Sequence, residues 1–219
     1  MPKPANARCV SWPAQSETGV AVSTTFHLVR HASHGVVGTT LVGRASHVHL
    51  SSEGRSQAGR LAQRFSNERI DAVVASPRER AQETAAPIAA ALGLLSQTSD
   101  ALDELDVGEW QGRRFSDLAD NPLWQRWNAA RSLARPPSGE AILEVQARMV
   151  RHVLDLREQR REGAFVIVSH AEPIRALLLY VLGLPIDAWA RIECSPASIS
   201  TIAMDDWGAQ VTRLNEAPS

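Results

Sequence analysis

Short apolar runs alternate with longer amphipathic segments along most of the chain. The runs at 25–30, 70–75 and 164–169 are rich in apolar residues, which is typical of strands buried on both faces of a parallel sheet. Segments with apolar residues at helical spacing follow or precede them, at about 51–65, 76–93, 139–161 and 173–182. This alternation predicts an α/β fold in three layers, α/β/α, with a mostly parallel central sheet.

Capping and turn residues indicate where several of these elements begin and end. Ser51 or Ser52 is placed to cap the first helix, and Ser76 followed by Pro77 predicts the start of the second, which Gly93 ends. Near the carboxyl end, apolar runs at 198–204 and 209–214 flank the sequence Asp-Asp-Trp-Gly, which predicts a closing β-hairpin.

The middle of the chain is less regular. Prolines interrupt short helical stretches between about 112 and 139, where Trp124 and Trp127 are spaced to pack on one helix face or to form a pocket wall. We therefore expect a single catalytic domain over 24–219, with a helical insertion around 112–139. The preceding residues, 1–23, are rich in Pro, Ser and Thr and are expected to form a flexible tail.

Charge and cysteine content narrow the class of protein. Lys and Arg number 23 and Asp and Glu 24, a net charge of −1, so we expect neither nucleic acid nor a membrane as partner. Cys9 and Cys194 supply no disulfide framework and no CxxC pair, and no apolar run near the start has the length of a signal or membrane segment. These features favour a cytoplasmic enzyme.

Candidate chemistry lies directly after the predicted strands, where ligands collect in open α/β sheets. The first strand runs into Arg30 and His31, the second into a segment that includes Arg80, and the third into His170 and Ala171. Imidazoles, guanidiniums and helix N-termini at one crevice suit a phosphoryl group, and a neutral imidazole is a competent nucleophile toward phosphorus. There is no GxxxxGK[ST] loop for a nucleoside triphosphate.

Four segments of the chain resemble one family in their order and spacing. Residues 28–32, LVRHA, are similar to the RHG signature of the histidine phosphatase (phosphoglycerate mutase-like) superfamily, and 76–85, SPRERAQETA, to its SPLxRAxxTA segment. Residues 102–112 resemble the LxE…GxWEG segment, and 168–176 the VSHGxxIRA element. The resemblance extends from about 26 to 214 and implies a phosphoglycerate mutase-like fold.

The resemblance also implies roles for individual residues. His31 becomes phosphorylated, Arg30, Arg80 and His170 hold the phosphoryl oxygens, and Glu104 is the proton donor. Gly43 and Arg44 lie in a segment similar to the substrate loop of the family, and Ala171 is expected to donate its backbone amide to substrate. No metal and no other cofactor is implied.

The chain departs from the family pattern at three positions. Ala32 and Ala171 stand where glycine is usual, and Val37 lies about where many members carry a phosphate-binding Asn. Because backbone amides at alanine still donate, we expect an altered phosphate site and not an inactive one.

Three functions remain open at this point. We favour a metal-independent phosphomonoesterase that forms a phosphohistidine and acts on a small phosphorylated metabolite, because 136–140, PPSGE, resembles the PPGGES element of the phosphatase branch. A phosphoglycerate mutase-type phosphotransferase shares the same nucleophile, and a non-catalytic phospholigand-binding module would have lost it. The physiological substrate is not determined by these motifs, and a homodimer is one possible assembly.

Overall fold

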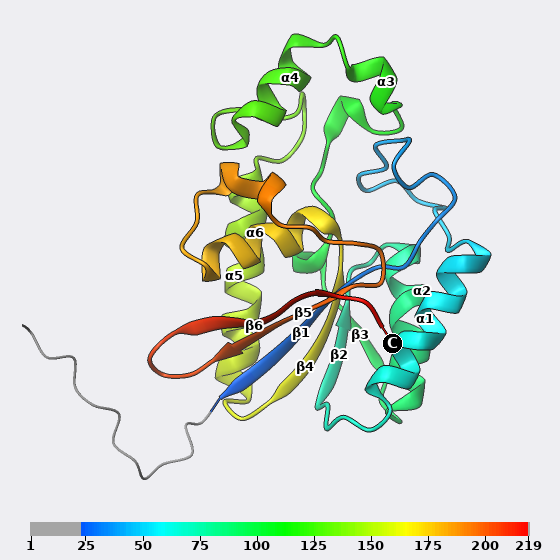
Figure 1. The fold of residues 1–219 in the computed structure, drawn as a ribbon, viewed down its shortest axis with the longest axis vertical. Helices are drawn as coiled ribbons and strands as arrows, with labels where there is room; N and C mark the ends of the chain where they lie inside the picture. The colour runs from blue at the N-terminus through cyan, green and yellow to red at the C-terminus, as the bar shows by residue number, and fades with distance from the viewer. Residues whose placement is uncertain (1–22, 219) are drawn as a thin grey trace, which may run out of the picture.

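The apolar runs of the sequence form most of a six-stranded sheet in the computed structural model, which describes residues 23–218 (Figure 1). The strands are β1 Thr24–Arg30, β2 Ala72–Ala75, β3 Ser96–Thr98, β4 Ala164–Ser169, β5 Ile199–Met204 and β6 Ala209–Glu216, in the order β3-β2-β4-β1-β5-β6. Strands β3, β2, β4 and β1 run parallel, whereas β5 and β6 form the predicted antiparallel hairpin at one edge. The prediction of a mostly parallel sheet is confirmed.

Helices connect these strands and extend above them. The α-helices are α1 Ser52–Phe65, α2 Glu79–Ala91, α3 Phe115–Leu118, α4 Pro122–Ala129, α5 Ile142–Gln159 and α6 Ala171–Val181. Short 3-10 segments are η1 Asp100–Leu102, η2 Gly108–Trp110, η3 Arg131–Leu133 and η4 Ile186–Arg191. None of the helices in residues 23–218 has the length and apolar character needed to cross a membrane.

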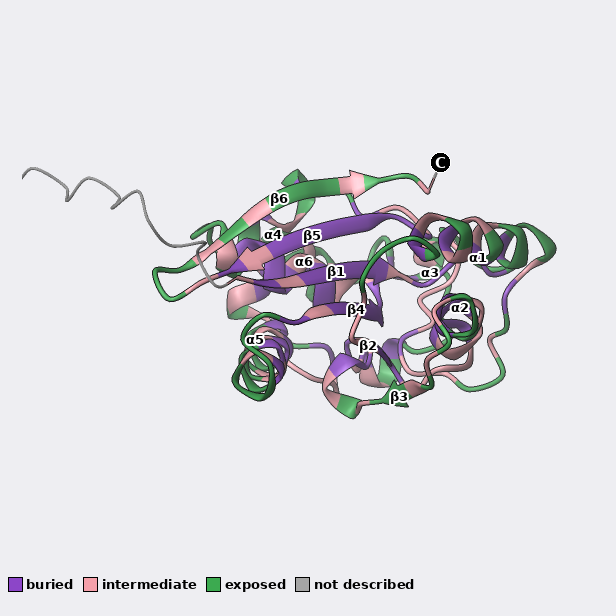
Figure 2. Cartoon of the chain, turned by 90° about the horizontal axis from the view of Figure 1, so that it is seen from below, coloured by how far each residue is buried: buried purple, intermediate pink, exposed green. Residues whose placement is uncertain are grey.

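The sheet has a hydrophobic core on each face. Along β4, Phe165 and Ile167 pack in a core with α5 and α6, whereas Val166 and Val168 pack in a second core with α1 and α2. Figure 2 shows the buried strands between α5 on one side and α1 and α2 on the other. Because both faces are covered, consecutive side chains of the strands are apolar, and the three-layer prediction is confirmed.

Two of the predicted helix boundaries are confirmed and one is wrong. The Ser51 side chain accepts a hydrogen bond from Gly54 N and caps α1, and Gly93, just after α2, has a φ of +66° that favours glycine. Helix α2 begins at Glu79, with no side-chain cap at Arg78, and not at Ser76 and Pro77. Ser76 instead lies fully buried after β2, where its hydroxyl group hydrogen-bonds to His170.

The segment between β3 and α5 carries the short helices expected around 112–139. It contains α3, α4 and η3, which lie above α5 and α6 in Figure 1. Strand β3 was not predicted, because it has three residues of little apolar character at the edge of the sheet. The expected tail, 1–23, lies outside the described residues except for its last position.

Candidate active site

His31 follows β1 and is almost completely buried, with 3% of its surface exposed. Its Nδ1 lies 2.9 Å from the Ala32 carbonyl oxygen, which can only accept, so Nδ1 carries the proton and Nε2 keeps its lone pair. Burial, together with the positive charges of Arg80 and Arg30, holds the pKa of His31 well below 6.5. His31 is therefore a neutral imidazole at neutral pH, with Nε2 available as a nucleophile.

His170, which follows β4, packs against the nucleophile candidate. The ring centroids of His31 and His170 are 5.0 Å apart, and His170 Nε2 forms a 2.7 Å hydrogen bond with Ser76 Oγ. Burial, and then the charge of Arg80, holds the pKa of His170 well below its usual value. Its Nδ1 is buried and has no partner in the described part of the chain.

Two guanidiniums complete this group, which we call the His31 end of the site: Arg30, His31, Arg80 and His170. Arg30 Nη1 donates to the Cys194 carbonyl at 2.6 Å, and Arg80 Nη2 donates to the Gly43 carbonyl at 2.8 Å. Within residues 23–218, Arg30 Nε and Arg80 Nε and Nη1 are buried without a hydrogen-bond partner. Buried N–H groups are rarely left unpaired, so this end is built to receive an anion.

Glu104 lies beside these groups in the loop after η1. Its Oε1 accepts a hydrogen bond from Leu105 N at 2.8 Å, and burial, followed by the charge of Glu172, raises its pKa to about 7. A substantial fraction of Glu104 is therefore protonated at neutral pH. Such a carboxylic acid can give a proton to a leaving group and take one back from water.

Arginines hold the backbone of Glu104 in place. Arg44 Nε and Arg148 Nη2 donate to the Glu104 carbonyl at 2.8 and 3.2 Å, while Glu104 N donates to Asp103 Oδ1 at 2.8 Å. Arg44 and Arg148 also donate to Glu140. The side chain of Glu104 thus extends from a backbone fixed by a network of charged groups.

The Pro-rich segment before α5 packs directly on this loop. Gly108 has a φ of +52°, and a Cβ at this position would lie 2.0 Å from the Pro137 carbonyl oxygen. Glu109 N donates to that carbonyl at 3.0 Å, and Glu140 N donates to Asp106 O at 2.8 Å. Two segments that the sequence places far apart thereby form one support for Glu104.

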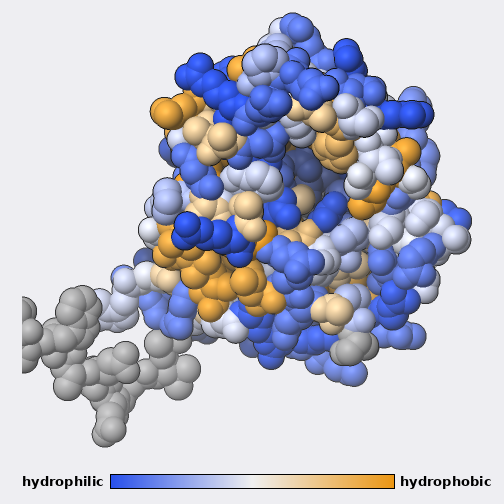
Figure 3. Space-filling view, turned by 45° about the horizontal axis from the view of Figure 1, so that its top comes forward, coloured by the Kyte–Doolittle hydropathy of each residue, from blue (hydrophilic) through white to orange (hydrophobic). Residues whose placement is uncertain are grey.

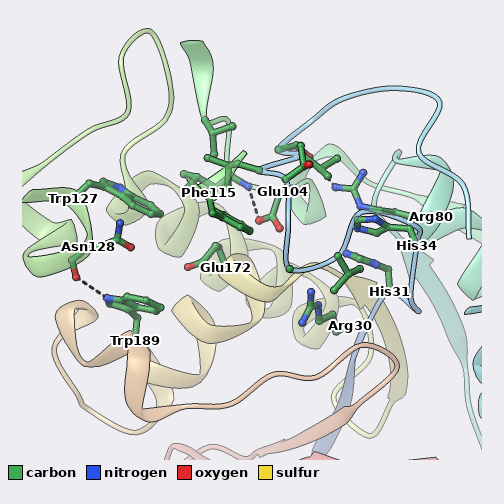
Figure 4. Close-up of a pocket in the computed structure, with 18 of the residues that line it drawn as sticks. Arg30, His31, His34, Arg80, Glu104, Phe115, Trp127, Asn128, Glu172 and Trp189 are labelled. Atoms are coloured by element: carbon green, nitrogen blue, oxygen red, sulfur yellow. Dashed lines mark hydrogen bonds between the residues drawn. The ribbon is translucent and has the colours of Figure 1, made fainter. Parts of the chain in front are cut away.

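The pocket beside Glu104 has a volume of about 320 Å³, at the lower end of the usual range for small-molecule sites. It forms a hollow on the face of the molecule shown in Figure 3. Figure 4 shows Arg30, His31 and Arg80 on one side, Trp127 and Trp189 on the other, and two carboxylates between them. The pocket is therefore elongated, with one charged end and one aromatic end.

The residues predicted for the site are not all in the pocket. Arg30, His31, Gly43, Arg80 and Glu104 line it, and His170 packs against His31. Val37 lines the pocket, whereas Ala171, the first residue of α6, is not one of its lining residues.

Two expectations change in the structure. Arg44 is absent from the pocket wall, because its guanidinium pairs with Glu140 and with the Glu104 carbonyl. The Ala32 amide, expected to be free to donate, is taken by Thr84 Oγ1 at 3.0 Å.

The aromatic side of the pocket was largely missed by the sequence analysis. We call it the Arg131 end: Trp127, Arg131, Glu172 and Trp189. The tryptophan spacing in α4 suggested packing or a pocket wall, and Trp127 does both, since it is buried and lines the pocket. Nothing in the sequence indicated that Arg131 and Trp189 would meet it, because η3 and η4 approach each other only in the folded chain.

Among the described residues, no three His, Cys, Asp or Glu side chains are grouped so that they could hold a metal ion.

Comparison with known proteins places this geometry in a family. The family model of the histidine phosphatase superfamily (branch 1) matches residues 26–217. The chain belongs to this superfamily. The histidine phosphatase fold accounts for the central sheet, and the family match includes all of the site residues described above.

Individual relatives in the superfamily carry different names. Phosphoserine phosphatase 1 of Hydrogenobacter thermophilus is 30% identical over 168 residues, 76% of this chain and 80% of that protein. A protein of Yersinia pestis described as a probable phosphoglycerate mutase, GpmB, is 31% identical over 186 residues, 80% of this chain and 83% of that protein. Both phosphatases and mutases are thus similar to this histidine phosphatase superfamily member.

A solved structure shows the same similarity in three dimensions. A mycobacterial glucosyl-3-phosphoglycerate phosphatase, Rv2419c, superposes with a TM-score of 0.80 at 25% identity, covering 88% of this chain and 99% of the other. The similarity in fold thus includes a protein named as a phosphatase.

Proposed function

We propose that this protein is a metal-independent phosphomonoesterase that acts on a small phosphorylated metabolite through a phosphohistidine on His31. The observation that carries the proposal is the arrangement at the His31 end. There, buried N–H groups of Arg30 and Arg80 without protein partners surround a neutral imidazole with a free Nε2. A phosphoryl group supplies both the missing acceptors and the electrophile.

The first step transfers the phosphoryl group to the enzyme. His31 Nε2 attacks phosphorus, the bond from phosphorus to the ester oxygen breaks, and Glu104 gives its proton to that oxygen. Arg30 and Arg80 stabilise the charge on the three equatorial oxygens. If Ser76 donates to His170 Nε2 and not to Asp103, then His170 Nδ1 carries a proton that no described residue accepts.

The second step releases phosphate. Water attacks the phosphorus of phosphohistidine, the P–N bond breaks, and the Glu104 carboxylate takes a proton from the water. Inorganic phosphate leaves, and His31 and Glu104 return to their starting protonation states. A cytoplasmic location fits this proposal, since Cys194 is a buried free thiol and not part of a disulfide in the described chain.

The test compares two adjacent histidines. His31→Ala should abolish both hydrolysis of p-nitrophenyl phosphate and the acid-labile phosphoenzyme seen after rapid quenching. His34→Ala is the matched control, because His34 stacks on His31 at 5.4 Å between ring centroids without being the nucleophile. A phosphoenzyme that persists in His31→Ala would contradict the proposal.

Metal independence is tested separately. Activity should survive EDTA, and vanadate should inhibit, because it takes the place of the phosphoryl group among the same side chains. Loss of activity on chelation, restored by a divalent ion, would contradict the metal-free mechanism.

A phosphoglycerate mutase-type phosphotransferase is the second candidate, favoured by the relative named GpmB. With 3-phosphoglycerate as substrate, a phosphatase releases stoichiometric inorganic phosphate, whereas a mutase isomerises the ester without net release. A non-catalytic phospholigand-binding module would do neither, although it would bind vanadate.

A further inference from the structure

The guanidinium of Arg131 is held flat between two indole rings. Arg131 is 3% exposed, and its Cζ lies 3.8 Å from the ring centroid of Trp127 and 3.5 Å from that of Trp189. Both faces of the guanidinium are therefore covered, and only its N–H edges can take part in hydrogen bonds.

One of these edges is used by the protein and another is free. Arg131 Nη1 donates to Glu172 Oε2, whereas Nε and Nη2 have no acceptor among residues 23–218. Nε is also buried. Nε and Nη2 form the edge of a guanidinium that binds a planar group through two parallel hydrogen bonds.

The Arg131 end also carries an excess positive charge. The other oxygen of Glu172, Oε1, accepts from Arg175 Nη1 at 3.1 Å. Glu172 is thus shared by two guanidiniums, so one positive charge is left without a counter-ion in this cluster. A buried cation with unpaired donors is costly unless a ligand supplies the acceptor.

The arrangement is braced from outside. Trp189 Nε1 donates to the Asn128 carbonyl at 3.4 Å, a contact drawn in Figure 4. Ser132, next to Arg131, donates through its amide and hydroxyl groups to Asp187 at 2.9 and 2.6 Å. The free edge of Arg131 is therefore fixed in position before a ligand arrives, which lowers the cost of binding.

We propose that Arg131 binds a carboxylate of the substrate, so that the enzyme acts on phosphate esters of small carboxylic acids. This inference rests on the proposed function and names the substrate class of the same pocket. A carboxylate is planar and carries one charge, which matches one guanidinium edge and one uncompensated positive charge. A second phosphoryl group would instead place a charge of about −2 next to Glu172 and Glu104.

The first experiment uses the wild-type enzyme and a matched pair of esters, 3-phosphoglycerate and glycerol 3-phosphate, which differ by a carboxylate against a hydroxymethyl group. We expect kcat/KM to favour the carboxylate ester by at least tenfold, equal to about 1.4 kcal/mol. Equal kcat/KM values for the two esters would overturn the proposal, and this test needs no variant.

The second experiment changes the guanidinium. Arg131→Met keeps an unbranched side chain between the indoles and should lower kcat/KM for 3-phosphoglycerate at least tenfold, while glycerol 3-phosphate changes less than threefold. Arg126→Met is the matched control, because Arg126 lies exposed on the same segment, in α4, and should change neither value. Arg131→Lys retains the charge without the planar guanidinium, so its kcat/KM for 3-phosphoglycerate should lie between those of the wild type and Arg131→Met.

The outcomes separate the two proposals. An equal loss for both esters in Arg131→Met and Arg131→Lys means that Arg131 only supports the pocket, and it overturns the carboxylate site. The phosphomonoesterase proposal stands in that case if p-nitrophenyl phosphate still forms the His31 phosphoenzyme. If Arg131→Met does not fold, the wild-type ester pair and Arg131→Lys decide.

Discussion

Both ends of the pocket carry guanidinium groups, but carboxylates form salt bridges with them at one end only. At the His31 end, Arg30 and Arg80 donate to backbone carbonyls, and neither has a carboxylate within salt-bridge distance in the described chain. At the Arg131 end, Glu172 pairs with Arg131 and with Arg175. The first arrangement leaves more positive charge for a ligand than the second.

The two ends also come from different parts of the fold. Arg30 ends β1, and His31 and His170 directly follow β1 and β4, which lie side by side in the sheet. Trp127 and Arg131 come from the segment between β3 and α5. A rigid sheet edge suits the chemistry that all substrates share, while an insertion can vary to recognise the rest of the substrate. The following predictions test this division of roles.

The largest effect is expected at the His31 end. Arg80→Met removes two buried donors from the phosphoryl site and should lower kcat/KM by roughly 10³-fold, near the upper end for loss of a charge-stabilising group. The loss should be the same for 3-phosphoglycerate and glycerol 3-phosphate, measured by phosphate release. A larger loss of kcat/KM for 3-phosphoglycerate than for glycerol 3-phosphate would mean that Arg80 contacts the carboxylate, and it would contradict its assignment to the phosphoryl site.

Glu104→Gln should have the next largest effect. We expect phosphorylation of His31 by an alkyl ester to slow by roughly 10²-fold, the usual scale for a positioned proton donor. Phosphorylation by p-nitrophenyl phosphate should slow much less, since p-nitrophenolate leaves without a proton. Pre-steady-state quenching measures this step alone. Equal slowing for both esters would mean that Glu104 only shapes the pocket.

The pH dependence follows from the same carboxyl group. Because the pKa of Glu104 is raised to about 7, the proton donor is present below pH 7 and is lost above it. For an alkyl ester, kcat/KM should therefore fall about tenfold per pH unit above pH 7. Because the pKa of His31 is well below 6.5, the nucleophile stays neutral over this range. If kcat/KM of Glu104→Gln fell in the same way above pH 7, the assignment of this pH dependence to Glu104 would be contradicted.

Arg44→Met should give the smallest effect. It tests whether Arg44 supports the backbone of Glu104 or contacts the substrate. The side chain donates to the Glu104 carbonyl, so its loss should lower kcat for alkyl esters about fivefold, as expected for one hydrogen bond of about 1 kcal/mol. KM should stay within about twofold. Arg55→Met is a control on the exposed side of α1. A large rise in KM with unchanged kcat would restore the predicted contact between Arg44 and substrate.

The sequence by itself determined most of the sheet, without β3, and which residues meet at the His31 end. Runs rich in apolar residues, as at 25–30 and 164–169, are typical of strands that are covered on both faces, so they indicate buried strands directly. Since parallel strands end at one edge, residues that follow them must meet, and this brought His31 and His170 together. The helix boundaries were less well determined. Ser76 was expected to cap a helix, but in the structure its hydroxyl group forms a buried hydrogen bond with His170.

Only the tertiary structure decided the Arg131 end and the surroundings of Glu104. Arg131 meets Trp189 because η3 packs on η4 through Ser132 and Asp187, and no local pattern encodes such a contact between irregular segments. Arg44 looked like a substrate residue, but the fold brings Glu140 and the Glu104 carbonyl to its guanidinium. Local periodicity reports which face of an element is buried, whereas the partner of a loop side chain depends on how distant segments pack.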